Sequence, residues 1–208
     1  MKRFFTGVAL SFLIVAVAVG ILAWVSFQAP SWYVPSNKES PEVVRLADRA
    51  EHHFNETIHK VRPETEVWRI RLGDEAMNAW LSARLEGWLT HDQDIELPPE
   101  LHDPQVHATT GGLWTYANVE ISDGYPRPLG VLWWVWIDGS TTHVEPLAIR
   151  LGKLPIPMSL FTEQIEELRE EMKGFEAKIP LLDDRVVEIQ HVAFEDGAIV
   201  MTCRTTLP

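Results

Sequence analysis

The chain has 208 residues and a formal net charge of -12 at pH 7, which arises from 18 basic and 30 acidic side chains. Because Lys2 and Arg3 precede the first acidic residue, Glu39, the chain from Asn37 onward carries 16 basic against 30 acidic residues, a net charge of -14. A field of this sign repels phosphate groups, so nucleic acid is excluded as an expected partner, and the single cysteine, Cys203, excludes an intrachain disulfide.

The N-terminal segment has the composition of a membrane anchor. It runs from Phe4 to Phe27 without a charged residue, and as a helix it would span about 36 Å, enough for the hydrocarbon core of a bilayer. Lys2 and Arg3 stand directly before it, and basic residues favour the cytoplasmic side. A cleaved signal peptide would have a shorter apolar region that ends in small residues. We therefore expect an uncleaved, single-pass transmembrane helix with a cytoplasmic N-terminus.

These signals divide the chain into four parts. They are a cytoplasmic N-terminus at 1–3, a transmembrane helix at 4–27, a stalk at 28–39 and an extracytoplasmic domain at 40–208. Residues 4–27 would make the lipid bilayer a partner of the chain and place the protein in the cell membrane. The residues Trp24, Trp32 and Tyr33 lie where the outer aromatic belt of such an anchor is expected.

The first half of the domain is predicted to alternate helix and strand. A serine-proline pair at 40–41 is typical of a helix start, and the apolar spacing after it predicts a helix of about twenty residues that Pro63 ends. Residues 67–72 alternate apolar and basic side chains, which indicates a half-buried strand. An apolar stripe at 77–88 predicts a second helix, and the lack of periodicity predicts a long exposed loop at 89–104.

The second half of the domain is predicted to be rich in strands. Turn residues separate segments that predict strands at 106–110, 113–121, 129–137, 143–151, 186–194 and 198–205, with a helix at 157–173. The segment 129–137 is almost continuously apolar, which predicts that both of its faces are covered. This order of elements favours an α+β fold, an antiparallel curved β-sheet with helices packed on one face.

Seven of the nine tryptophans lie beyond the anchor and the stalk. Large aromatic rings are common core residues, so core packing is the first interpretation. The alternative is a ligand groove, because neighbours on a strand point to opposite faces and one face of 129–137 would then line an apolar groove. The residues predicted to bind an apolar ligand are Trp80, Trp114, Trp133, Trp134 and Trp136.

No residue pattern dictates a reaction. The side chains that a hydrolase would use are Asp138, Ser140, His143 and His191. However, the nucleophile elbow of many hydrolases is absent, and Asp-Gly-Ser between two strands is ordinary turn chemistry. The polar residues with metal-ligand chemistry on the first predicted helix are His52, Glu56 and His59. No further ligand is indicated near them, so we predict no metal site. We likewise predict no catalytic residue and no cofactor.

Two segments resemble the YpmS-like family of uncharacterised bacterial membrane-anchored proteins. They are the helix core Ala76-Met77-Asn78-Ala79-Trp80-Leu81 and the segment 147–157, with its Gly-Lys-Leu-Pro-Ile-Pro end. An N-terminal anchor, a β-meander and two last strands complete the likeness, whereas the Trp-rich strand and the long first helix depart from it. The resemblance implies an extracytoplasmic domain whose curved sheet cradles helices, similar by analogy alone to lipid-holding folds. It implies no activity, because the family carries no established one.

Together these features predict a non-enzymatic, membrane-anchored extracytoplasmic domain that binds an apolar ligand, such as a lipid, or an envelope protein. Two alternatives stay open. The first is an envelope hydrolase that uses the acid, hydroxyl and imidazole groups named above. The second is a purely structural subunit of a membrane complex, which would expose an apolar patch and lack a cavity.

Overall fold

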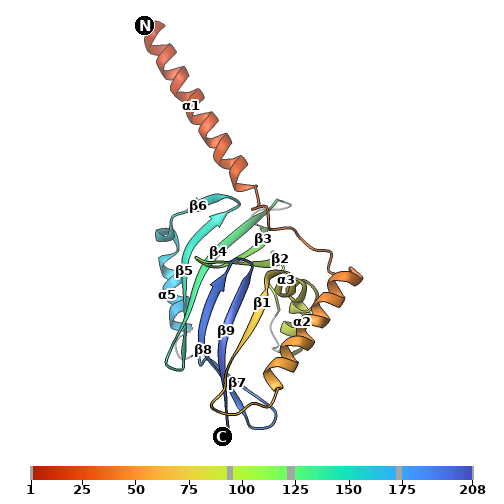
Figure 1. The fold of residues 1–208 in the computed structure, drawn as a ribbon. Helices are drawn as coiled ribbons and strands as arrows, with labels where there is room; N and C mark the ends of the chain where they lie inside the picture. The colour runs from red at the N-terminus through yellow and green to blue at the C-terminus, as the bar shows by residue number, and fades with distance from the viewer. Residues whose placement is uncertain (1, 93–95, 121–124, 172–174, 208) are drawn as a thin grey trace.

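The computed structural model describes residues 2–92, 96–120, 125–171 and 175–207, and the α+β prediction is confirmed within them (Figure 1). The described helices are α1 (Lys2–Ser26), α2 (Pro41–His59), α3 (Asp74–Ala83), α4 (Leu85–Asp92) and α5 (Thr162–Glu171), with the 3-10 turn η1 (Met158–Phe161). The described strands are β1 (Val67–Gly73), β2 (Leu101–Thr109), β3 (Gly112–Glu120), β4 (Pro126–Asp138), β5 (Thr141–Leu151), β6 (Leu154–Ile156), β7 (Lys178–Pro180), β8 (Val186–Glu195) and β9 (Ala198–Thr206).

The strands form two antiparallel sheets, so the prediction of a single sheet is wrong. The first sheet has the strand order β1-β9-β8-β7, and the second sheet has the order β2-β3-β4-β5-β6. The division arises because β1 pairs with β9 along its whole length, from Val67 opposite Arg204 to Gly73 opposite Ala198. Local periodicity reveals a strand but not its partner, and here the partner lies at the other end of the chain.

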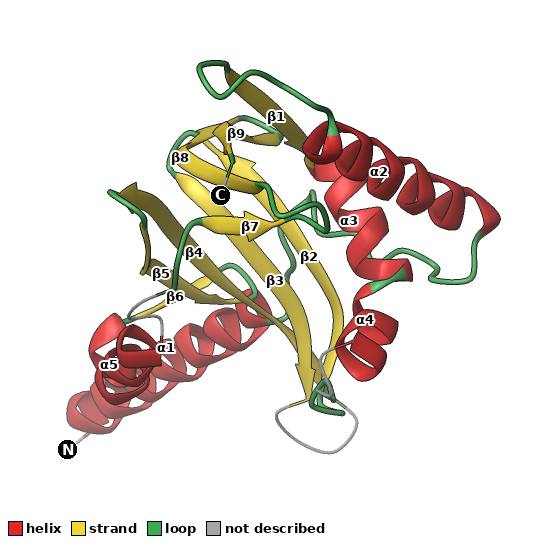
Figure 2. Ribbon diagram, turned by 90° about the horizontal axis from the view of Figure 1, so that it is seen from below, coloured by secondary structure: helices red, strands yellow, loops and turns green. Residues whose placement is uncertain are grey.

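The helices do not share one face of a sheet. Helices α2, α3 and α4 lie together on one side of the molecule, whereas α5 lies on the other side (Figure 2). There α5 contacts β5, and the Arg169 guanidinium donates to the Glu145 carboxylate across that contact at 2.9 Å. The two groups of helices therefore flank different strands.

Two predicted elements between 74 and 104 differ from the structure. The second helix breaks at Arg84, whose φ of -123° ends α3 before α4 begins. The predicted loop at 89–104 is shorter, because α4 continues to Asp92 and β2 begins at Leu101; residues 93–95 lie outside the described part. Strand β2 starts early because Leu101 pairs with Val119 on β3, and its register shifts between His102 and Gln105. The Asp103-Pro104 sequence at this irregularity interrupts the apolar alternation, so periodicity does not predict this part of the strand.

The predicted helix at 157–173 begins as a 3-10 turn and continues as α5, and its positions 172 and 173 lie outside the described residues. The apolar spacing of this predicted helix also predicts that Leu160 is buried, but Leu160 lies in the 3-10 turn and is 68% exposed. The short strands β6 and β7 escape prediction, since three residues carry too little periodicity.

A compact core lies between α2 and the sheet that contains β1. Its buried members are Ile58, Trp68, Ile70, Leu181, Val187 and Cys203. As the alternating pattern predicts, β1 buries Trp68 and Ile70 and exposes the residues between them. The indole Nε1 of Trp68 donates to the Thr205 hydroxyl on β9 at 3.2 Å, so the polar atom of this ring is satisfied inside the core.

The thiol of Cys203 provides a test of this core. Cys203 is 2% exposed, and burial raises the pKa of its thiol to about 11, against the opposing effect of the Arg62 charge. Because the thiolate is the reactive form, we expect iodoacetamide at pH 8 to leave Cys203 unmodified in the native chain. Denaturant should expose it to stoichiometric alkylation, measured by mass spectrometry.

The same shift fixes the sign of a pH effect. A thiol that stays neutral in the folded state favours folding below its unfolded pKa, and this contribution declines as the pH rises from about 9 toward about 11. Stability should therefore fall over that range, and Cys203→Ala should weaken the decline. Rapid alkylation of the native chain at pH 8 would contradict a closed core.

Helix α1 extends away from the rest of the molecule (Figure 1). Its side chains are described from Leu13 onward, and the large apolar ones as far as Trp24 are about half exposed or more. Among the residues that the structure describes, no helix is both long enough and apolar enough to cross a membrane.

Residues 30–36, here called the strap, pack on the domain after α1 ends. The Trp32 ring centre lies 4.8 Å from that of His107 and 5.2 Å from that of Tyr116. Tyr33 is 5% exposed, and its hydroxyl donates to the Asp103 carbonyl at 3.0 Å. Burial raises the pKa of the Tyr33 phenol. Trp32 and Tyr33 therefore pack on aromatic rings of the second sheet.

Candidate ligand-binding pocket

Helix α3 is fixed against the edge of β2 by two of its polar side chains. The Asn78 amide donates to the Val106 carbonyl at 2.9 Å and accepts from the Val106 N–H at 2.7 Å. One turn earlier, the Asp74 carboxylate accepts from the Ala108 N–H at 3.0 Å and lies 2.5 Å from Nδ1 of His107. These side chains form hydrogen bonds with backbone groups of β2 that have no partner strand on that edge, and they fix the position of α3.

Helix α2 is held in front of α3 and α4 by Arg84, the residue at which the predicted single helix breaks. The Arg84 guanidinium forms an ion pair with Asp48 on α2, and its Nε lies 3.9 Å from the Glu51 carboxylate. These pairs are solvent-exposed, so each is worth little energy alone. The helix also breaks at Arg84, and across this break the Trp88 ring of α4 lies 5.9 Å from the Trp80 ring of α3.

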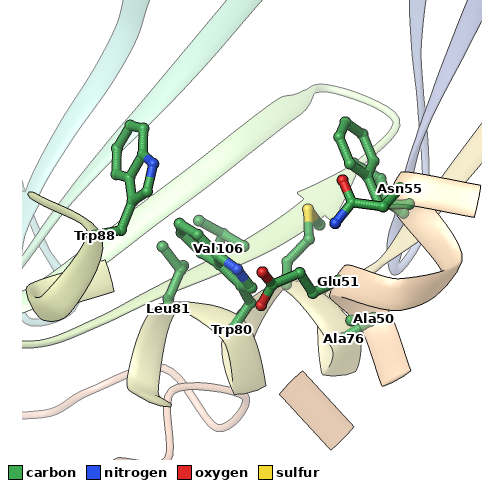
Figure 3. A pocket seen from close by; sticks show the side chains of 11 residues that line it. Ala50, Glu51, Asn55, Ala76, Trp80, Leu81, Trp88 and Val106 are labelled. Atoms are coloured by element: carbon green, nitrogen blue, oxygen red, sulfur yellow. The ribbon is translucent and has the colours of Figure 1, made fainter. Parts of the chain in front are cut away.

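A pocket of about 500 Å³ opens between these three helices and the two strands behind them (Figure 3). Its lining residues are Ala50, Glu51, Phe54, Asn55, Leu72, Ala76, Met77, Trp80, Leu81, Trp88 and Val106. Nearly all of them are apolar, and the volume lies in the range of small-molecule sites in proteins.

The polar groups of the pocket sit on one side. Glu51 and Asn55 come from successive turns of α2 and are exposed, and Figure 3 places both on the side opposite Trp88. Trp88, which forms the other end, is 41% exposed. The apolar body of a ligand could therefore pack against the tryptophan and aliphatic side chains of the pocket, and a polar end group could lie beside Glu51 and Asn55 of α2.

The pocket takes in one of the five tryptophans predicted to bind a ligand. Trp80 lines it. Trp114 packs instead on Tyr116, with the Arg150 guanidinium 4.6 Å from its ring centre. Trp133 lies in the second sheet, where its Nε1 donates to the Thr115 hydroxyl at 2.8 Å.

The remaining two tryptophans lie at the far end of β4. Trp134 packs on Phe194 of β8 with ring centres 5.5 Å apart, and Trp136 stacks on His143 of β5 at 5.0 Å. They are 38% and 37% exposed, so the prediction that both faces of this strand are covered is wrong here. Strand β8 of the first sheet packs on β4 but leaves these two rings partly open to solvent.

The side chains predicted for a hydrolase do not converge within the described part of the chain. Asp138, the last residue of β4, and Ser140, in the turn to β5, are both exposed, whereas His143 stacks on Trp136. His191 is exposed on β8 opposite Thr202. No hydrogen bond among the described residues joins either histidine to the acid or the hydroxyl, so the geometry provides no activated nucleophile there.

Sequence reasoning missed most of the pocket, although a signal for it exists. The stripe of Met77, Trp80, Leu81 and Trp88 is predictable as the buried face of a helix. Because a helix that is broken at its middle does not bury that stripe evenly, part of it lines a cavity instead of a core. The helix breaks at Arg84, between Ala83 and Leu85, where neither a proline nor a glycine marks the end of a helix, so the sequence pattern does not predict the break.

Comparison with known proteins adds no relative to this picture. No protein-family model matches the chain, and no curated protein matches it. The resemblance of 76–81 and 147–157 to the YpmS-like family stays a prediction.

Proposed function

We propose that this chain is a membrane-tethered extracytoplasmic domain that binds the acyl chain of a lipid in the pocket between α2, α3 and α4, without catalysis. The observation that carries the proposal is the pocket itself, about 500 Å³ of almost wholly apolar lining in an otherwise strongly acidic domain. An apolar concavity of this size is costly to leave in water and gains free energy when hydrocarbon fills it.

The tether is supported by the sequence. Residues 4–27 carry no charge and follow Lys2 and Arg3, which favours insertion with the N-terminus in the cytoplasm. The exposed apolar side chains between Leu13 and Trp24 need a cover, and lipid is the cover that such a projecting helix favours. A tether of this kind would keep the pocket close to a supply of acyl chains. The same architecture is what the YpmS-like resemblance implies.

The pocket residues favour a single-chain ligand over a bulky one. Trp80 and Trp88 form one wall, and the opposite wall is the Ala50 and Phe54 face of α2. Small side chains at Ala50 and Ala76 leave the space that an acyl chain would occupy. Filling that space is therefore the most direct way to remove binding.

A photoreactive fatty acid tests the proposal in membranes that hold the full chain. After irradiation, we expect the cross-linked peptides to come chiefly from 72–88 and 50–55. Ala76→Phe fills the pocket and should lower this cross-linking about tenfold, because the chain would lose most of its buried contact area. The measurement is peptide mass spectrometry with the wild-type chain alongside.

Leu182→Phe is the control, because it places the same phenylalanine side chain at a fully exposed position outside the pocket. Cys203 protection against alkylation reports that each variant is folded. Cross-linking spread evenly over the domain, or unchanged by Ala76→Phe in a folded chain, would overturn the assignment of the pocket.

A further inference from the structure

The junction between α1 and the domain is rigid. Ser26, the last residue of α1, is buried, and the Lys153 N–H donates to the Val25 carbonyl at 3.2 Å. Gly152 has a φ of +59°, and a Cβ at this position would lie 2.5 Å from the Ser26 carbonyl oxygen. Only glycine allows the β5–β6 turn to approach the helix end this closely. The helix end is thus built into the domain.

The strap secures the same junction from the other side. Both backbone groups of Val34 bond to the side-chain amide of Gln105, which is itself buried: the Val34 N–H donates to Oε1 at 3.1 Å, and Nε2 donates to the Val34 carbonyl. Tyr33 adds its bond to the Asp103 carbonyl. Because the domain holds both the end of α1 and the strap, the end of the second sheet beside α1 keeps a fixed orientation relative to that helix.

Two cations stand at this end of the domain. The Arg127 guanidinium lies 4.3 Å over the Phe27 ring, with Nη1 3.5 Å from the Ser26 hydroxyl. Lys153 is exposed next to the bond that its own N–H makes to Val25. Over the described residues, no carboxylate lies within ion-pair distance of either cation. Several arginines elsewhere in the domain do form ion pairs, such as Arg71 with Glu195 and Arg185 with Asp183.

We propose that Arg127 and Lys153 bind anionic lipid headgroups of the bilayer that α1 enters, and so hold this end of the second sheet on the membrane surface. The inference rests on the proposed tether. The acidic remainder of the domain is repelled by such a surface, so the two cations at the helix end supply the local attraction. Their partner is a phosphate of the lipid surface, since the rigid junction keeps both side chains beside it.

Amine labelling of the full chain in nanodiscs tests the proposal. In discs of phosphatidylcholine with phosphatidylglycerol, Lys153 should react with an amine reagent about fivefold more slowly than in phosphatidylcholine alone, because its ammonium is held at the headgroups. Lys60 and Lys178 are the internal references, since the end of α2 and β7 lie opposite α1 (Figure 1). Their rates should not depend on the lipid.

Arg127→Gln should reduce the protection of Lys153 to about twofold, and high salt should reduce it further. Lys60→Gln makes the same change of charge away from the junction and should leave the protection intact. Equal reactivity of Lys153 in both lipids, in a chain that resists carbonate extraction, would overturn this inference alone. A chain that carbonate removes from both membranes would overturn the tether and the inference together.

Discussion

Replacement of Trp68 by alanine is expected to lower the free energy of unfolding by about 3–5 kcal/mol, the cost of removing a large aromatic side chain from a core. Trp68 is buried among Ile58, Leu181 and Val187. Its indole donates to Thr205, and the Arg62 guanidinium lies 4.0 Å over its ring. The truncation thus opens a cavity and leaves a buried hydroxyl without its donor. Denaturant-dependent alkylation of Cys203 in the full chain measures the change.

Two variants separate the contributions. Trp68→Phe keeps most of the buried area and should cost less than half as much as the alanine variant, because it loses chiefly the bond to Thr205. Leu182→Ala removes a fully exposed side chain and should leave the midpoint unchanged. A loss below about 1 kcal/mol for Trp68→Ala would mean that this cluster is not the main core of the first sheet.

The sequence predicts those parts of the fold that local spacing determines. Residues 67–72 alternate with period two, and β1 buries Trp68 and Ile70 as expected. The Glu-Asp-Gly turn at 195–197 closes the last hairpin, with Gly197 at a φ of +78° that the tight turn requires. Each of these features depends on a few consecutive residues, so no knowledge of distant contacts is needed.

Features that depend on distant partners escape the same reasoning. The pairing of β1 with β9 divides the strands into two sheets, and nothing near Val67 identifies a partner some 130 residues away. The pocket has the same origin, because Trp80 and Trp88 line it only once Arg84 has broken the helix and reached Asp48 on α2. Of the predicted ligand-binding tryptophans, Trp80 alone comes from a helix, and it is the one in the pocket.

Strand β2 connects the pocket to the strap. Gln105 bonds to the strap at Val34, and its neighbour Val106 lines the pocket and bonds to Asn78 of α3. The next residue, His107, lies under Trp32 and beside Asp74. Consecutive residues of one strand thus fix the strap and the wall of the pocket. A disturbance of the strap is therefore expected to reach the pocket through β2.

Gly130→Ala is the variant expected to disturb the strap most. Gly130 on β4 lies opposite Tyr116 on β3, and the Tyr116 ring rests on the glycine so closely that any Cβ would overlap it. Displacing the ring would break the bond from its hydroxyl to the Gly152 carbonyl, 3.1 Å, and its contacts with Trp32 and Tyr33. We expect a loss of about 3 kcal/mol in unfolding free energy, the upper range for overpacking.

A double-mutant cycle identifies Tyr116 as the cause. Tyr116→Phe alone removes one buried hydrogen bond and should cost about 1 kcal/mol. Tyr116→Leu removes the ring that the new methyl group would meet, so adding Gly130→Ala to it should cost at least 1 kcal/mol less than adding it to the wild-type chain. Thermal unfolding followed by circular dichroism, with an expected fall of about 10 °C in Tm for Gly130→Ala, provides the measurement. Strictly additive losses would show that the glycine is required for a reason other than the ring that lies on it.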